Sequence, residues 1–165
     1  MTVPRAEALL LAVVGLVACD AGTPAQTPPI VPGSSGSPRE VNLITKDYSY
    51  LPGVLDVIPG ETVLLHVING GLITHEAVIG NAATQAAWTV AEAGPEDPPP
   101  GPTPVVSVPP DVAGLRIVVT TGQRVDVVWT VPADAATQGP WIVACHIPGH
   151  LEKGMEIPVR WAPAP

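Results

Sequence analysis

Proline and glycine divide this chain into short segments, and this division limits the folds that it can adopt. The 165 residues include 22 Pro and 16 Gly, and few of the stretches between them show the 3.6-residue periodicity of an amphipathic helix. Short runs rich in Val, Ile and Thr between turn-forming residues are typical of β-strands. The sequence therefore predicts an all-β protein, and its length suits one domain of ordinary size.

Seven to eight strands can be placed along the chain, which predicts a Greek-key β-sandwich or barrel. The expected strands lie within 41–45, 54–58, 61–69, 74–79, 116–131 (two strands joined around Thr121-Gly122), 140–145 and 156–161. An alanine-rich stretch after Asn81 suits one short helix. Eight prolines from Pro95 to Pro110 cannot lie in a central strand, so a Pro-rich surface insertion without an assigned role is expected there.

The N-terminal residues 1–19 are predicted to be a signal peptide of the bacterial lipoprotein type. A short n-region precedes an apolar run of residues 8–18, which is too short for a membrane span of about 20 residues. The run ends in Leu-Val-Ala-Cys, which resembles a lipobox and implies lipidation of Cys19; an ordinary cleaved signal peptide is the alternative. Residues 20–38 are then a flexible Pro/Gly/Ser tether, and residues 39–165 form the folded domain.

The charge and the cysteine content of the chain argue against some classes of protein and favour others. The formal net charge is -8 and the sequence has no cluster of Lys or Arg, which argues against a nucleic-acid partner because phosphates bind to basic surfaces. If Cys19 carries lipid, the second cysteine, Cys145, is the only thiol and no intramolecular disulfide can form. A lone thiol in an exported protein is prone to oxidation unless something occupies it, and this favours a bound metal.

The segment CHIPGHLEKGM, from Cys145 to Met155, collects soft and imidazole ligands that are rare elsewhere in the chain. Pro148-Gly149 suits the centre of a type II turn, which would bring His150 back towards the sulfur. The best candidate for a second imidazole is His75, at the start of a short strand. A thiolate, a thioether and two imidazoles are the ligands of a blue-copper centre, whereas structural zinc sites rarely use Met.

Other roles for Cys145 account for fewer of these residues. A buried inert thiol would leave its neighbours unexplained. A cysteine nucleophile needs a base, which His146 or His150 could supply, and an oxyanion site, but it gives Met155 and the turn no role. His66, in the middle of a strand, is expected to be a satisfied histidine of the sheet, and His146 to lie behind the ligands or at the surface.

The same segments resemble those of cupredoxins. CHIPGHLEKGM is similar to the Cys-x4-His-x4-Met copper loop of rusticyanin-like and sulfocyanin-like members, and NGGLITHEAVIG is similar to the segment that carries their first copper histidine. The resemblance covers residues 39–165 and implies a Greek-key β-sandwich with one type 1 copper ion. It implies that His75, Cys145 and His150 are equatorial ligands and that Met155 is a weak axial ligand.

Two residues depart from the family pattern. Glu76 follows the first copper histidine where relatives often have Asn or Asp, whose role is to brace the ligand loops; a carboxylate near copper would favour the oxidised state. His146 directly follows Cys145, as in multicopper oxidases. However, Ala144 replaces the other histidine of that motif, and one domain cannot supply the eight histidines of a trinuclear cluster, so the sequence argues against an oxidase.

The resemblance implies one-electron transfer through Cu(II)/Cu(I), so the chain is expected to be an electron carrier and not an enzyme. The expected partners are redox proteins, such as a cytochrome or a haem-copper oxidase, and the membrane through the lipid on Cys19. A monomeric, membrane-anchored lipoprotein in the periplasm or on the outer face of the cytoplasmic membrane is expected. The alternatives are a copper-binding or copper-delivery protein and a detached accessory copper domain of an oxidase or nitrite reductase.

Overall fold

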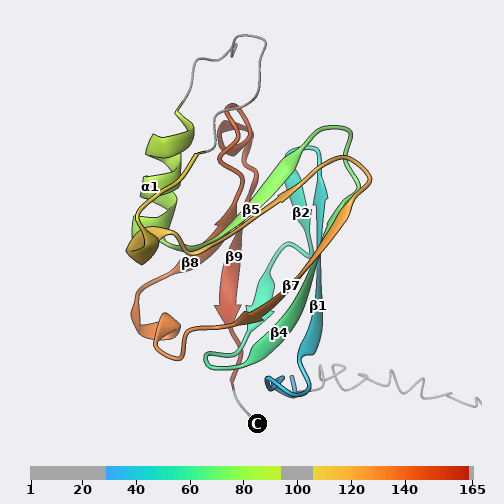
Figure 1. Ribbon diagram of the computed structural model, residues 1–165, viewed down its shortest axis with the longest axis vertical. Coiled ribbons are helices and arrows are strands. Elements are labelled where there is room, and N and C mark those ends of the chain that lie inside the picture. Colours follow the sequence, from blue (N-terminus) through green and yellow to red (C-terminus); the bar gives the residue numbers. More distant parts are fainter. Residues whose placement is uncertain (1–28, 94–105, 164–165) are drawn as a thin grey trace, which may run out of the picture.

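Two β-sheets face each other in the computed structural model, which describes residues 29–93 and 106–163 (Figure 1). The four-stranded sheet has the order β2-β1-β4-β7, with bounds β1 Arg39–Lys46, β2 Ser49–Leu51, β4 Thr62–Asn69 and β7 Arg124–Thr130. The five-stranded sheet has the order β3-β9-β8-β5-β6, with bounds β3 Leu55–Val57, β5 His75–Asn81, β6 Leu115–Val119, β8 Trp141–Ala144 and β9 Glu156–Trp161. The predicted all-β sandwich is therefore confirmed.

The chain passes repeatedly from one sheet to the other, as in a Greek-key sandwich. The strands β4 and β5 are consecutive but lie in different sheets, and so do β6 and β7. The two strands expected within 116–131 are thus both present, but they are not partners: β6 pairs with β5, and β7 pairs with β4. Alternation of apolar residues identified these strands, whereas their pairing depends on the whole core.

Apolar side chains from both sheets fill the space between them. The strand β4 pairs in parallel with β1 and antiparallel with β7, so it is covered on both edges. One continuous cluster contains buried apolar side chains from both sheets, among them Leu43, Leu65, Val67, Ile79, Val119, Val143 and Ile157. Trp141 is buried, and Trp129 and Trp161 pack against the same cluster.

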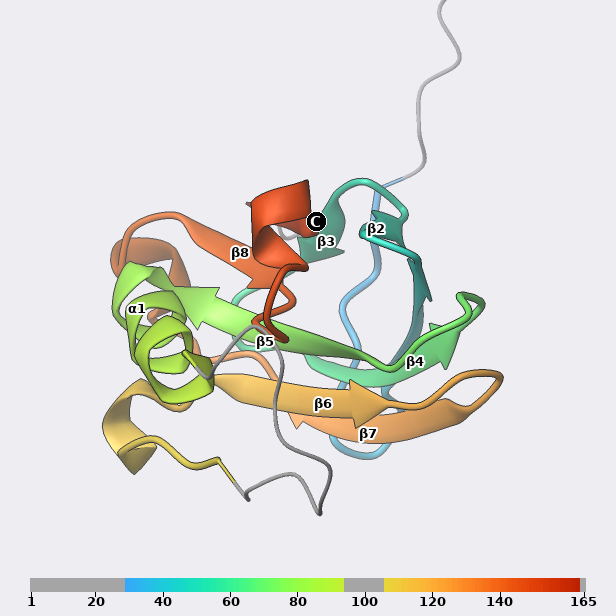
Figure 2. The same cartoon turned by 90° about the horizontal axis from the view of Figure 1, so that it is seen from above.

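The alanine-rich stretch forms the helix α1 (Ala82–Glu92), which lies beside the five-stranded sheet (Figure 2). The side chain of Asn81 accepts hydrogen bonds from the N–H groups of Ala83 and Thr84, both at 3.1 Å, and so caps the helix. Trp88 is buried and its Nε1 donates to the carbonyl of Ala113 at 2.9 Å. Short 3₁₀ turns follow at Pro110–Val112, Ala135–Thr137 and Leu151–Lys153.

The folded part begins earlier than the predicted boundary at residue 39. The carbonyl of Gly33 accepts the N–H of Thr62 at 3.0 Å, and a Cβ atom at Gly33 would lie only 2.1 Å from the carbonyl oxygen of Thr62. Residues 33–38 therefore belong to the domain rather than to the tether. The signal peptide and Cys19 lie outside the described residues.

Glu61 fixes this first segment to the sheets. Its carboxylate accepts hydrogen bonds from the guanidinium of Arg39, from the N–H of Ile58 at 2.8 Å and from the N–H of Gly33 at 3.3 Å. Burial opposes the ionisation of Glu61, but the guanidinium and the two N–H groups outweigh it, so its pKa lies below the ordinary glutamate value. Among the described residues, no helix is both long and apolar enough to cross a membrane.

Truncation of a core valine should destabilise the fold far more than truncation of an exposed one. Val67 is fully buried on β4, whereas Val128 on β7 is 63% exposed. Val67→Ala should lower the free energy of unfolding by about 2–3 kcal/mol, through lost burial and a residual cavity. Val128→Ala, the matched control, should change it by less than about 1 kcal/mol. Denaturant unfolding measures both, and equal effects would contradict the assigned core.

Glu61→Gln should make the free energy of unfolding less sensitive to acidification. Because the folded-state pKa of Glu61 is depressed, its contribution is present above the ordinary glutamate pKa of about 4.3 and is lost as the pH falls through the depressed value. The variant should be less stable than the parent protein at neutral pH, and this difference should shrink on acidification. Glu40→Gln, whose side chain is 75% exposed, is the control and should leave the pH profile unchanged.

Candidate metal centre

Three buried side chains that the sequence singled out meet at one end of the sandwich. The ligand atoms of His75, Cys145 and His150 all lie within 4.8 Å of one another. The sulfur of Cys145 is 3.3 Å from Nδ1 of His150, and the ring centroids of His75 and His150 are 5.1 Å apart. His75 opens β5, and Cys145 directly follows β8, so antiparallel pairing of these strands brings the two residues to the same end of the sheet.

The predicted turn shapes the loop from Cys145 to Met155. The N–H of His150 donates to the carbonyl of Ile147 at 3.0 Å, and Gly149 has a φ of 83°, the left-handed value that a type II turn needs at its third residue. The turn therefore directs His150 back to the sulfur, as expected.

Backbone hydrogen bonds also place Met155. The N–H of Cys145 donates to the carbonyl of Met155 at 3.1 Å, and the N–H of Met155 donates to the carbonyl of His150, also at 3.1 Å. The side chain of Met155 is fully buried. Met155, the fourth predicted ligand, is thus joined by backbone hydrogen bonds to Cys145 and His150.

The chemistry of these side chains fits a bound metal ion. Nδ1 of His75 is buried and has no hydrogen-bond partner among the residues that the structure describes, which is costly for a polar atom. Burial raises the pKa of the Cys145 thiol to about 12, although N–H groups of Glu76 and Ile147 oppose the shift. A metal ion would accept the free lone pair and replace the thiol proton, so it would satisfy both groups.

The surroundings of His150 favour its neutral form, which is the form that binds metal ions. Burial is the main cause that lowers its pKa, and the neighbouring His75 lowers it further. The imidazole is therefore neutral at neutral pH and keeps a lone pair available for coordination.

The loop that carries His75 is braced by a residue that sequence reasoning did not single out. Nδ2 of Asn69 donates to the carbonyls of Ile73 at 2.8 Å and Val119 at 3.0 Å, and its Oδ1 accepts the N–H of Gly71 at 2.8 Å. Asn69 is buried. The sequence offers one signal for Asn69: it is a polar residue at the end of an apolar strand, just before two glycines.

Glu76 braces the strand that carries His75 against the Cys145–Met155 loop. It is fully buried, and its Oε1 accepts the N–H of His146 at 2.9 Å, which ties β5 to the Cys145–Met155 loop. Its Oε2 accepts Nε of Arg116 at 2.7 Å, and Nη2 of Arg116 also donates to Glu92 at 2.7 Å. Burial raises the pKa of Glu76, while Arg116 and the His146 N–H oppose this shift.

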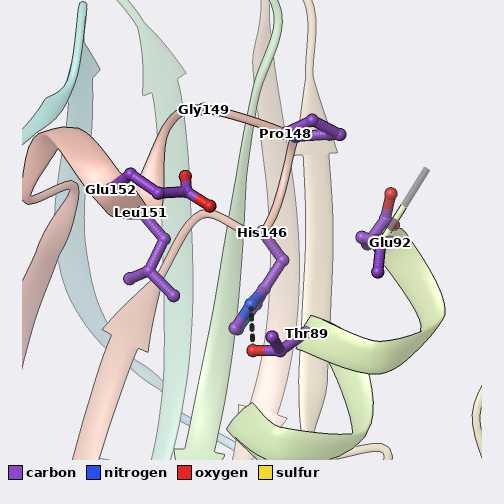
Figure 3. Close-up of a pocket in the computed structure, with 8 residues that line it drawn as sticks. Thr89, Glu92, His146, Pro148, Gly149, Leu151 and Glu152 are labelled. Carbon is purple, nitrogen blue, oxygen red and sulfur yellow. Dashed lines mark hydrogen bonds between the residues drawn. The ribbon is translucent and has the colours of Figure 1, made fainter. Parts of the chain in front are cut away.

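His146 and His66 lie outside the cluster of three and have other partners. The ring of His146 is hydrogen-bonded through Nδ1 to Thr89 at 3.2 Å and through Nε2 to Gln85 at 2.7 Å. It faces a cavity of about 300 Å³ between α1 and the loop (Figure 3). Nδ1 of His66 is 2.8 Å from the carboxylate of Asp126. Both histidines have hydrogen-bond partners, as predicted for His66.

Comparisons with known proteins find a similar fold in solved structures of auracyanins and an azurin. No family model and no curated protein matches the sequence. Among solved structures, the auracyanin of Roseiflexus castenholzii aligns with a TM-score of 0.54 at 21% identity, covering 79% of this chain and 100% of that one. Auracyanin A of Chloroflexus aurantiacus, described as a "blue" copper protein, gives 0.53 at 21% identity over 74% and 98%.

The azurin of Methylomonas sp. strain J aligns with a TM-score of 0.52 at 14% identity, over 76% of this chain and 98% of that one. At such identities the likeness concerns the fold. The cupredoxin fold inferred from the two sequence segments is thereby confirmed.

Loss of the Glu76 carboxylate should destabilise the domain. Removing one member of a buried ion pair leaves its partner uncompensated, so Glu76→Ala should lower the free energy of unfolding by roughly 3–5 kcal/mol. Glu76→Gln, which keeps the volume and an acceptor for the His146 N–H, should cost less. Glu92→Gln, the control at the outer arm of Arg116, should cost least because the inner pair remains. Urea unfolding tests this order, and a Glu76→Ala variant as stable as the parent protein would contradict it.

Proposed function

We propose that this chain is a one-electron carrier that binds a single copper ion through His75, Cys145, His150 and Met155. The observation that carries the proposal is the meeting of three buried ligand atoms within 4.8 Å, one of them a thiol, beside a buried methionine. Thiolate, thioether and two imidazoles favour copper over zinc or the hard cations. The fold shared with auracyanins and azurin supports this assignment.

The protein contributes rigidity and exclusion of water. Bound copper supplies the Cu(II)/Cu(I) couple, and the side chains hold the ligand atoms in one arrangement. His75 and Cys145 stand at the ends of paired strands, so neither can move without disturbing the sheet. Both side chains are fully buried. A site that changes little in shape between two charge states suits rapid electron transfer, and the chain then makes or breaks no bond in a substrate.

The backbone also stabilises the sulfur as an anion. N–H groups of Glu76 and Ile147 point to Cys145 and favour its charged form. The carboxylate of Glu76 accepts the N–H of His146, the residue after Cys145, and adds negative charge near the site. We therefore expect these groups to tune the reduction potential that the ligands set: the N–H donors should raise it and the carboxylate should lower it.

The setting of the protein is also proposed. The sequence features of residues 1–19 and Cys19 support export and a lipid anchor, hence a location outside the cytoplasm at the membrane surface. Single-electron partners such as a cytochrome or a haem-copper oxidase suit a carrier in that position. The main alternative is a copper-delivery protein, in which exposed, adaptable ligands are expected; the full burial of His75, Cys145 and Met155 disfavours it.

Copper addition to the purified protein tests the assignment. The parent protein should turn intensely blue and cycle reversibly between oxidation states, whereas a delivery protein would stay pale and release copper to a chelator. Cys145→Ser should abolish the colour because the sulfur-to-copper bond is lost. Met155→Leu should retain the colour and change the reduction potential. Optical spectra and voltammetry measure these outcomes.

A matched pair of histidine variants controls for general damage. His75→Gln should lose the blue colour, whereas His66→Gln, at a histidine outside the cluster, should keep it. A blue colour that survives Cys145→Ser would refute the proposed centre.

A further inference from the structure

The two-residue turn between β1 and β2 contacts both imidazoles of the candidate centre. Lys46 pairs with Ser49, so Asp47 and Tyr48 form the turn. Oδ1 of Asp47 is 3.2 Å from Nε2 of His75. The ring of Tyr48 meets the ring of His150 edge-on, with centroids 5.2 Å apart and an interplanar angle of 87°.

The contact with Asp47 decides which nitrogen of His75 faces the site. A carboxylate oxygen only accepts hydrogen bonds, so it selects the form of His75 with its proton on Nε2. That form leaves a lone pair on Nδ1, which is the buried atom without a partner among the described residues. The N–H of Leu72 donates to the same Oδ1 at 2.8 Å and holds the carboxylate in place.

Glycine at position 71 is required for this contact. A Cβ atom there would lie 2.4 Å from Oδ1 of Asp47 and 3.0 Å from Nε2 of His75. Any side chain would therefore enter the space between the carboxylate and the imidazole. The absence of a side chain at Gly71 therefore allows the hairpin to reach His75.

Tyr48 is held in an unusual backbone conformation over the other imidazole. Its φ of 63° lies in the left-handed region, which is uncommon for a bulky residue and persists only where the surroundings enforce it. Nζ of Lys153, from the Cys145–Met155 loop, lies 3.9 Å from the centroid of the Tyr48 ring, within the range of a cation–π contact. The half-buried Tyr48 ring thus contacts both His150 and Lys153.

We propose that Asp47 and Tyr48 are positioning residues for the metal centre. Asp47 fixes the orientation of His75 so that Nδ1 faces the metal, and Tyr48, with Lys153 above it, covers His150 and restricts the exit of copper and the entry of competing ligands. One short turn therefore supports both imidazoles from outside the ligand set. This inference rests on the proposed copper site, and the roles of Asp47 and Tyr48 are tested separately.

The role of Asp47 can be tested in the full chain without any metal. Long-range proton–nitrogen correlation spectra distinguish the two neutral forms of His75. The parent protein should show the proton on Nε2. Asp47→Asn retains an oxygen acceptor and should keep that form, whereas Asp47→Ala should give a mixture of both. An unchanged His75 spectrum in Asp47→Ala would overturn the role of Asp47, whatever metal the site binds.

Copper binding gives the second readout for Asp47. Loss of a residue that orients a metal-bound histidine typically lowers metal affinity by about 10–100-fold, so Asp47→Ala should fall in that range and Asp47→Asn should stay closer to the parent protein. Affinity in Asp47→Ala equal to that of the parent protein would overturn this role. If the parent protein itself binds no copper, the proposed function fails, and the metal-free spectra still decide how His75 is oriented.

Removal of bound copper by a chelator tests Tyr48. Asn accepts left-handed backbone, so Tyr48→Asn should preserve the turn while deleting the ring, and it should release copper roughly 10-fold faster or more. Tyr48→Phe keeps the ring and should behave as the parent protein does, and so should Ser49→Ala, an exposed neighbour in the same hairpin. Lys153→Gln should give a smaller acceleration. A Tyr48→Asn variant that folds and releases copper at the parent rate would overturn the role of Tyr48.

Discussion

The register of three adjacent strands determines where the candidate centre forms. In β5 and β8, Val78 pairs with Ala144, and in β8 and β9, Ala144 pairs with Glu156. Cys145 therefore follows directly beside Met155, and His75 comes to the same end of the sheet. A shift of one residue in either pairing would turn every side chain of the shifted strand to the opposite face. The buried apolar residues of these strands prevent such a shift.

Polar groups around the centre are satisfied by contacts that cross between elements. The carboxylate of Glu76 binds the backbone of His146 and the side chain of Arg116, and the amide of Asn69 joins the His75 loop to β6. Within residues 29–93 and 106–163, Nδ1 of His75 finds no hydrogen-bond partner and is the exception at the centre itself. A buried network that lacks one partner, at a point where three ligand atoms meet, indicates that the partner is an ion.

The sequence was sufficient to predict the parts of the structure that depend on local patterns. The turn at Pro148-Gly149 and the approach of His150 to Cys145 follow from residues close together in the chain. Alternating apolar residues indicated most strands and hence the fold class. The second imidazole, His75, was chosen for its place at the start of a short strand and then supported by the family resemblance, because nothing local connects it with a loop 70 residues away.

Contacts between distant segments could not be predicted in this way. The sequence gives no sign of a role for Asp47 and Tyr48, which becomes visible only when the hairpin of β1 and β2 is placed beside His75 and His150. Arg116 lies 40 residues from Glu76, and no sequence pattern pairs them. The packing of Gly33 against Thr62 depends on the parallel pairing of β1 with β4. Composition alone does not reveal this pairing, and the predicted tether was therefore too long.

Support of both histidines by adjacent residues constrains how this hairpin can evolve. One added or deleted residue between Lys46 and Ser49 would displace the acceptor of His75 and the cover of His150 in a single step. Selection is then expected to preserve the length of the hairpin more strictly than the identity of its residues. Alignments of distant relatives that place gaps between these two strands would compare positions that are not equivalent.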